Sequence, residues 1–227
     1  GTIVHFDNLH PLLTRKVYVP VVGDLMPSRW AYEALAVEQF QNNQFEKHFF
    51  QHEMVMSQSH FRTAFEIPRL QAKLDESLRL IESGEKDHHK IALNLNLVKN
   101  ELIALEKAAH LPPFEFVNSL NIDDFNESIF EEANGYLIFI KFQITDVGKR
   151  ESERKDSVYQ KLVDSLSAEK VFELKQKNHN KALADWVLNT YDINKYLETH
   201  DRIIQIHEPI DMLPYHAWDR WIVDAPM

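Results

Sequence analysis

The chain has 227 residues, of which 25 are Lys or Arg and 35 are Asp or Glu, so its formal net charge is −10. This length fits one large domain or two small ones and is enough to bury a full core. The acidic balance argues against an electrostatic nucleic-acid surface, because phosphate binding needs clustered Lys and Arg. The lack of cysteine excludes disulfides, thiolate zinc sites and cysteine nucleophiles.

The glycine content and the apolar runs limit the function further. Only 5 glycines are present, and neither GxGxxG nor GxxxxGK[ST] occurs, so we expect no nucleotide binding by this chain. Apolar stretches such as 136–140 fall far below the roughly 18 residues of a membrane span. The chain opens at Gly1 without an initiator Met or a signal peptide, and we expect it to be a soluble excised piece of a longer protein.

The first long element is predicted to be a helix that starts near Pro27. Its apolar positions continue at helical spacing, and the same pattern extends toward Phe50. The periodic residues are Ala31, Ala34, Leu35, Val37, Phe40, Phe45 and Phe49.

Two apolar stripes on either side of Gly84 predict an antiparallel helical hairpin from about Pro68 to Lys107. The first stripe repeats at steps of four, four and three, and the second has the spacing of a heptad seam. The few polar residues between them force the helices to be neighbours. The stripes are Leu70, Leu74, Leu78 and Ile81, then Ile91, Leu95, Val98, Leu102 and Leu105.

A third long helix is predicted from about Asp123, packed on the hairpin. The charged run 149–156 carries both signs at helical spacing, so we expect the helix to continue through it to Leu166. Its broad apolar face contains Ile129, Phe130, Ala133, Tyr136, Leu137, Ile140 and Ile144.

A further helix should follow Ser167, and two stripes compete for its buried face. The stripe through Phe172, Gln176 and His179 is favoured over the one through Val171 and Leu174. Two β-branched stretches, 2–6 and 202–207, predict short strands that pair near the chain ends. The expected fold class is therefore mainly α, with antiparallel helical hairpins, long helices and a small β element near the termini.

Twelve histidines call for a search for metal ligands, and the best pair is His48 and His52, with Glu46 and Glu53 nearby. The helical zinc-protease motif places Glu directly after the first His, whereas Glu53 follows the second. Ordinary, partly exposed histidines are favoured over a metal site. No catalytic, metal or cofactor residue is predicted, and an enzyme that depends on a histidine-bound metal remains an alternative.

The most specific signal lies in 1–40. This segment contains a proline, an arginine and an aromatic residue, then Glu-Ala-Leu, and then an acidic residue two positions before a phenylalanine. The order and spacing of these residues resemble the stretch after the fifth membrane helix in White-type (subfamily G) ABC transporters. The resemblance makes six residues candidates for coupling this segment to the membrane part, namely Pro27, Arg29, Tyr32, Glu33, Glu38 and Phe40. Because Arg29 and Glu33 are four residues apart, we expect them to form an ion pair.

The last 20 residues or so loosely resemble the return segment before the sixth membrane helix of bacterial relatives, on a motif that runs from Pro214 to Met227. The resemblance divides the chain into a membrane-proximal segment and helix (1–45), an inserted helical domain (46–205) and a return segment (206–227). The insertion is larger than in the better-known eukaryotic members, and their external-loop cysteines are absent. Disulfide-based assembly therefore does not carry over.

The resemblance implies a non-enzymatic extracytoplasmic domain at the periplasmic face of the inner membrane, which acts in gating, substrate exit or partner contact. Its partners would be the membrane-spanning part of the same chain and a second transporter half, as a homodimer or heterodimer, with no nucleic acid. ATP and Mg²⁺ would belong to the parent transporter. A cytosolic helical adaptor remains an alternative, since heptad-like seams also bind protein partners.

Overall fold

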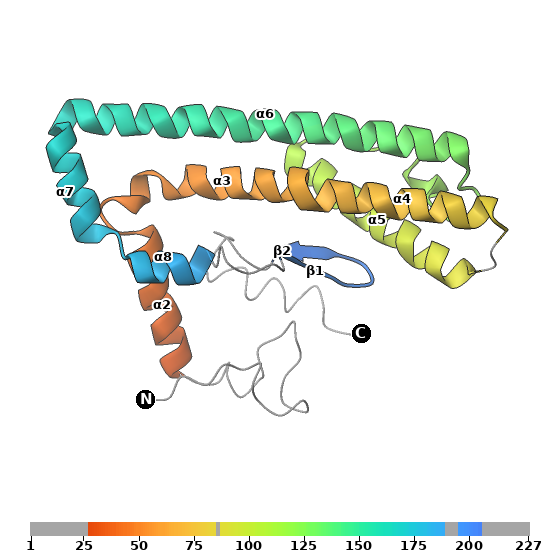
Figure 1. Ribbon diagram of the computed structural model, residues 1–227, viewed down its shortest axis with the longest axis horizontal. Coiled ribbons are helices and arrows are strands. Elements are labelled where there is room, and N and C mark those ends of the chain that lie inside the picture. The colour runs from red at the N-terminus through yellow and green to blue at the C-terminus, as the bar shows by residue number, and fades with distance from the viewer. Residues whose placement is uncertain (1–26, 85–86, 189–194, 206–227) are drawn as a thin grey trace.

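The computed structural model describes residues 27–84, 87–188 and 195–205 (Figure 1). This part of the chain is mainly helical and has one small antiparallel sheet, which confirms the predicted fold class. The helices of two turns or more are α2 (Pro27–Gln41), α3 (Phe50–Phe61), α4 (Ile67–Glu82), α5 (His88–Ala109), α6 (Glu127–Leu166), α7 (Ala168–Asn178) and α8 (Lys181–Leu188), and the strands are β1 (Tyr196–Glu198) and β2 (Ile203–Gln205).

α3 and α4 form one continuous rod, joined by a π-helical turn over Arg62–Glu66. Within this turn the N–H of Ile67 donates to the carbonyl of Arg62, five residues back. Pro68 follows directly, and proline has no N–H and crowds the carbonyl four residues before it. The wider turn relieves that conflict, so the chain passes Pro68 without breaking the helix.

The predicted hairpin is present as α4 and α5. Gly84 adopts φ +70° in the connection, a conformation that favours glycine. The Asp87 side chain caps α5 by accepting from the N–H of Lys90 at 3.1 Å. Both predicted stripes face the core, and Leu70, Leu74 and Leu102 are fully buried.

α6 is 40 residues long, about 60 Å, and continues through the charged run as predicted. It begins at Glu127 and not near Asp123, because the Asn121 side chain accepts the N–H groups of Asp123 and Asp124 and holds them in a turn. Asn126 then caps the helix by accepting from Ile129 N–H. None of the helices in the described ranges has the length and apolar character needed to cross a membrane.

Two predictions are wrong, one on the end of a helix and one on the buried face of another. The first helix does not run on to Phe50, because the Asn43 side chain accepts the N–H groups of Phe45 and Glu46 at 3.0 and 2.8 Å and turns the chain after Gln41. On α7 the buried side chain is Val171 (1% exposed), whereas Phe172, on the favoured stripe, is 60% exposed. Packing against α6 decided between two stripes of similar periodicity.

β1 and β2 pair antiparallel, with Leu197 opposite Ile204. The predicted strand within 202–207 is therefore present at Ile203–Gln205. Its expected partner, 2–6, lies outside the described residues, and the described partner is β1.

The buried side chains form two separate clusters. The large cluster joins α4, α5 and the first half of α6, with Leu137 and Ile140 fully buried at its centre. The small cluster lies where α7 folds back from α6, and its buried members are Phe45, Phe49 and Val171. Figure 1 shows the resulting shape: α6 lies along one edge opposite the α3–α4 rod, with α2, α7 and α8 gathered at one end.

Candidate functional site

The six residues singled out by their family-like spacing all lie on α2, which spans Pro27–Gln41 without interruption. Four of these side chains, and with them the expected Arg29–Glu33 ion pair, lie outside the described part of the structure. The other two have clear surroundings. Glu38 accepts a hydrogen bond from the Asn42 side-chain amide at 2.9 Å, and the ring of Phe40 meets Phe50 edge to face, with centroids 5.9 Å apart.

α2 lies beside the segment that returns from the far side of the molecule. The Asn180 side-chain amide donates to Gln39 Oε1 at 3.3 Å, and α8 packs against α2. One residue earlier, His179 Nδ1 lies 2.8 Å from Glu46 Oε1. The chain that leaves α2 at residue 41 therefore comes back beside it at residue 180.

The candidate metal ligands are not brought together. His48 is exposed on a single 3₁₀ turn, and α3 starts only at Phe50, so His48 and His52 are not one turn apart on one helix. His52 Nδ1 instead lies 2.7 Å from Glu151 Oε2 on α6. Within 27–84, 87–188 and 195–205, no group of three or more His, Cys, Asp or Glu residues is placed to hold a metal ion.

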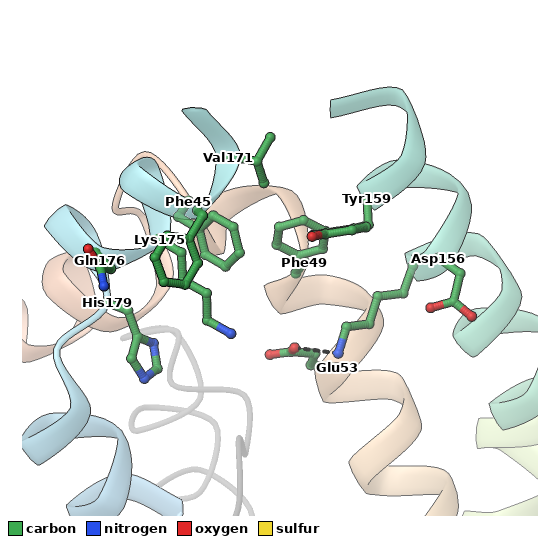
Figure 2. A pocket seen from close by; sticks show the side chains of 11 residues that line it. Phe45, Phe49, Glu53, Asp156, Tyr159, Val171, Lys175, Gln176 and His179 are labelled. Atoms are coloured by element: carbon green, nitrogen blue, oxygen red, sulfur yellow. Dashed lines mark ion pairs between the residues drawn. The ribbon is translucent and has the colours of Figure 1, made fainter. Parts of the chain in front are cut away.

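A pocket of about 500 Å³ opens at the corner formed by α3, α6 and α7 (Figure 2). Aromatic rings dominate its wall: Phe45 and Phe49 come from the chain before α3, and the ring of Tyr159 on α6 lies beside that of Phe49, with centroids 6.4 Å apart. Val171 and Phe172 of α7 complete the apolar surface. The small buried cluster therefore borders an open, largely aromatic cavity.

Charged side chains line the rim of this pocket. Lys155 Nζ forms an ion pair with Glu53 Oε1 at 2.7 Å, drawn as a dashed line in Figure 2. Lys175 Nζ lies 5.8 Å from the centroid of the Phe45 ring, within the range of a cation–π contact. Aromatic faces beside charged groups suit an apolar or aromatic group of a partner. The lining contains no Ser, Thr or Cys that a neighbouring base could activate.

A second polar site is buried inside the large cluster. Glu66, the last residue of the π turn, is 5% exposed, and Glu101 of α5 is 4% exposed. Their carboxyl groups hydrogen-bond to each other, which requires a proton on one of them. Glu101 Oε1 also accepts the backbone N–H of Ile203 at 2.5 Å, so this pair fixes β2 to the helices.

Burial controls the ionisation of this carboxyl pair. Loss of solvent, followed by the charge of Glu101, raises the pKa of Glu66 from 4.5 to about 8, against an opposing effect of Arg62. Burial also raises the pKa of Glu101, although the N–H of Ile203 stabilises its charged form. The pair therefore holds one shared proton near neutral pH.

This pair was not predicted from the sequence, although a signal was present. Glu101 lies three residues after Val98 and four before Leu105, and Glu66 lies four before Leu70. An acid at a stripe position of an apolar helix predicts a buried carboxyl group. The corner pocket gave no comparable signal, because Phe45 and Val171 are far apart in the sequence and meet only through the turn from α6 to α7.

Three features of the described residues could therefore carry a function: the contacts with α2, the aromatic corner pocket and the buried carboxyl pair. No protein-family model, curated protein or solved structure matches this chain.

Proposed function

We propose that this chain is the extracytoplasmic domain of a membrane subunit of a White-type ABC transporter. It acts in gating, substrate exit or partner contact and does no chemistry itself. The proposal implies the periplasmic face of the inner membrane, a membrane-spanning part in the same protein and a second transporter half. ATP and Mg²⁺ would act in the ATP-binding part of the parent protein.

One observation supports the proposal more than any other. The family-like motif lies on α2, and the chain returns to that helix through the Asn180–Gln39 hydrogen bond and the contact with α8. A domain inserted between two consecutive membrane helices must leave and re-enter at neighbouring points. The contact at α2 brings Asn180, late in the insertion, back beside the helix from which the insertion starts, as expected if the chain re-enters near the point where it leaves.

The helices suggest how such a domain would transmit movement. The α3–α4 rod and α6 lie antiparallel, and two polar contacts join them, a hydrogen bond between His52 and Glu151 and an ion pair between Lys155 and Glu53. Two long paired helices, one of them about 60 Å long, are stiff compared with a loop. A tilt of α2 at the base would therefore be carried to the α4–α5 turn at the opposite end of the molecule (Figure 1).

The location can be tested with a single introduced cysteine, because the chain has none of its own. Ser157 on α6 is exposed, and Ser157→Cys in the full-length parent protein should react in intact cells with a thiol reagent that cannot cross the inner membrane. The matched control is Ser77→Cys, since Ser77 is fully buried and should stay unlabelled before and after lysis. Labelling of Ser157→Cys only after lysis would reject the extracytoplasmic location.

The second candidate is the cytosolic helical adaptor, and it is favoured by exposed apolar side chains such as Phe142 and Phe172, which are 70% and 60% exposed. The same labelling experiment separates the two, because an adaptor would react only after lysis. The gene on either side of this segment gives an independent check: the transporter proposal expects hydrophobic spans before Gly1 and after Met227, and an adaptor gene would lack them.

A further inference from the structure

The segment that contains β1 and β2, residues 195–205, crosses the helices as a short strap with little apolar anchorage. Within this range Ile203 is the one buried side chain. The ring of Tyr196 adds a partly buried contact with Phe65, with centroids 6.4 Å apart. An element with few buried apolar contacts opens at a lower free energy than the core beneath it. We therefore expect the strap to detach while α4 and α5 stay folded.

Polar contacts at two points hold the strap on the helices. At the first point Glu198 of β1 accepts from Arg69 Nε at 2.6 Å and lies 2.8 Å from Lys73 Nζ, both on α4. At the second point the N–H of Ile203 on β2 donates to Glu101 Oε1 at 2.5 Å. The Glu198 carboxylate remains partly exposed to water, whereas Glu101 is buried. One attachment is therefore a partly exposed ion pair, and the other belongs to the buried carboxyl pair.

The buried attachment needs a proton to stay closed. Glu101 accepts from the strap and also from Glu66, so the proton that they share is donated by Glu66. Without it, two carboxylates would face each other away from water, where like charges repel strongly. Arg62 of the π turn and Arg202 of the strap offset part of this repulsion, and Asp201 of the strap adds to it. Among the described residues, no charge on α3, α4 or α6 acts on the pair with comparable strength.

We propose that the strap is a proton-dependent latch, whose docking on α5 binds one proton between Glu66 and Glu101 and whose release gives that proton to solvent. Release takes the N–H of Ile203 away from Glu101 and opens the carboxyl pair to water. The strap is therefore held more tightly as pH falls. The inference does not depend on the transporter proposal, because it uses only contacts between the strap and the helices.

The pKa of Glu66 sets the pH range in which the latch responds. With the strap docked, burial and then the charge of Glu101 raise this pKa to about 8, and it returns toward 4.5 once water reaches the group. Between these two values the docked state holds a proton that the open state has lost. The equilibrium constant for opening then rises about tenfold for each pH unit. Outside this range both states carry the same number of protons, so the dependence ends.

Hydrogen exchange of the 227-residue chain, followed by mass spectrometry at several pH values, tests the latch. Protection factors are the quantity to compare, since they divide out the pH dependence of the chemical exchange rate. Peptides that cover β2 should lose about a hundredfold in protection between about pH 5.5 and about pH 7.5. At each pH they should be less protected than peptides of α5, which exchange only when the whole fold opens. Equal protection of β2 and α5, or protection of β2 that does not change with pH, would overturn the proposal.

Two variants separate the proton from the other contacts of the strap. Glu66→Gln keeps a donor to Glu101 but cannot ionise, so β2 should be as protected at about pH 7.5 as at about pH 5.5. Glu198→Gln is the matched control, because it weakens the strap through α4. Against the effect of burial, the hydrogen bonds from Arg69 and Lys73 lower the pKa of Glu198, so this group stays ionised over the range and its loss should reduce protection by the same factor at every pH. A pH dependence that survives in Glu66→Gln, or disappears in Glu198→Gln, would reject the carboxyl pair as the latch.

Discussion

The buried carboxyl pair makes the stability of this fold depend on pH in an unusual direction. Glu66→Gln is the informative change, because a glutamine amide keeps the size of the side chain and can still donate to Glu101. It resembles the protonated form of Glu66 but cannot ionise. Any difference in pH dependence between variant and wild type therefore reports the proton of Glu66.

The magnitude follows from the pKa of this group. Glu66 titrates at about 8 in the folded state and at about 4.5 when exposed, so between these values the folded state holds a proton that the unfolded state has lost. Stability then falls as pH rises, by about 1.4 kcal/mol for each pH unit. Glu66→Gln should therefore have almost the same free energy of unfolding as wild type near pH ~4, and a free energy of unfolding about 3 kcal/mol higher near pH ~7.

Urea denaturation at several pH values measures this difference, provided that the slope of unfolding free energy against urea is the same in both proteins. Glu115→Gln is the matched control, since it removes the same ionisable group from an exposed position. If the gain in stability from Glu66→Gln were the same at acid and neutral pH, or largest in acid, the carboxyl pair would not hold a proton at neutral pH.

Three further predictions follow from other parts of the molecule. Ile140→Ala should lower the free energy of unfolding by about 2 to 5 kcal/mol in the same denaturation assay, because Ile140 is fully buried in the large cluster; a loss below about 1 kcal/mol would contradict that position. Arg29→Ala and Glu33→Ala should each leave the melting temperature of the chain nearly unchanged and impair transport or ATPase coupling in the full-length protein, where normal activity of both variants would refute the coupling role. The chain purified without a histidine tag should contain no stoichiometric zinc by elemental analysis, and zinc that disappears in His48→Ala would instead favour the metal-enzyme alternative.

The sequence predicted the helices wherever one apolar stripe had no competitor. Each of α4 and α5 has a single apolar stripe, and α6 has a single broad apolar face around Leu137 and Ile140, so only one side of each helix could face the core. The hairpin of α4 and α5 followed from the short connection between these two helices. Periodicity could not choose between Val171 and Phe172, since each begins a stripe, and the choice depended on which one met Phe45 and Phe49.

The candidate site was less predictable than the fold for a related reason. The π turn before Pro68 places Glu66 opposite Glu101, and a one-residue change in helix geometry does not appear in a periodicity count. The exposure of Ile138, Phe139 and Phe142 on α6 could not be predicted either, because in the sequence these residues belong to an ordinary apolar segment. Their exposure is visible only once the neighbours of α6 are known.

The separation of the buried side chains into two clusters has a consequence for hydrogen exchange. Amides of α4, α5 and the first half of α6 are covered by the large cluster and should exchange only through global unfolding. The end of α6 and α7 are held by three buried side chains beside an open pocket, so this corner should open on its own and exchange faster. A group bound in the pocket would slow exchange in α7 first, and mass spectrometry of the α7 peptides would thereby identify a ligand of the corner before any activity is known.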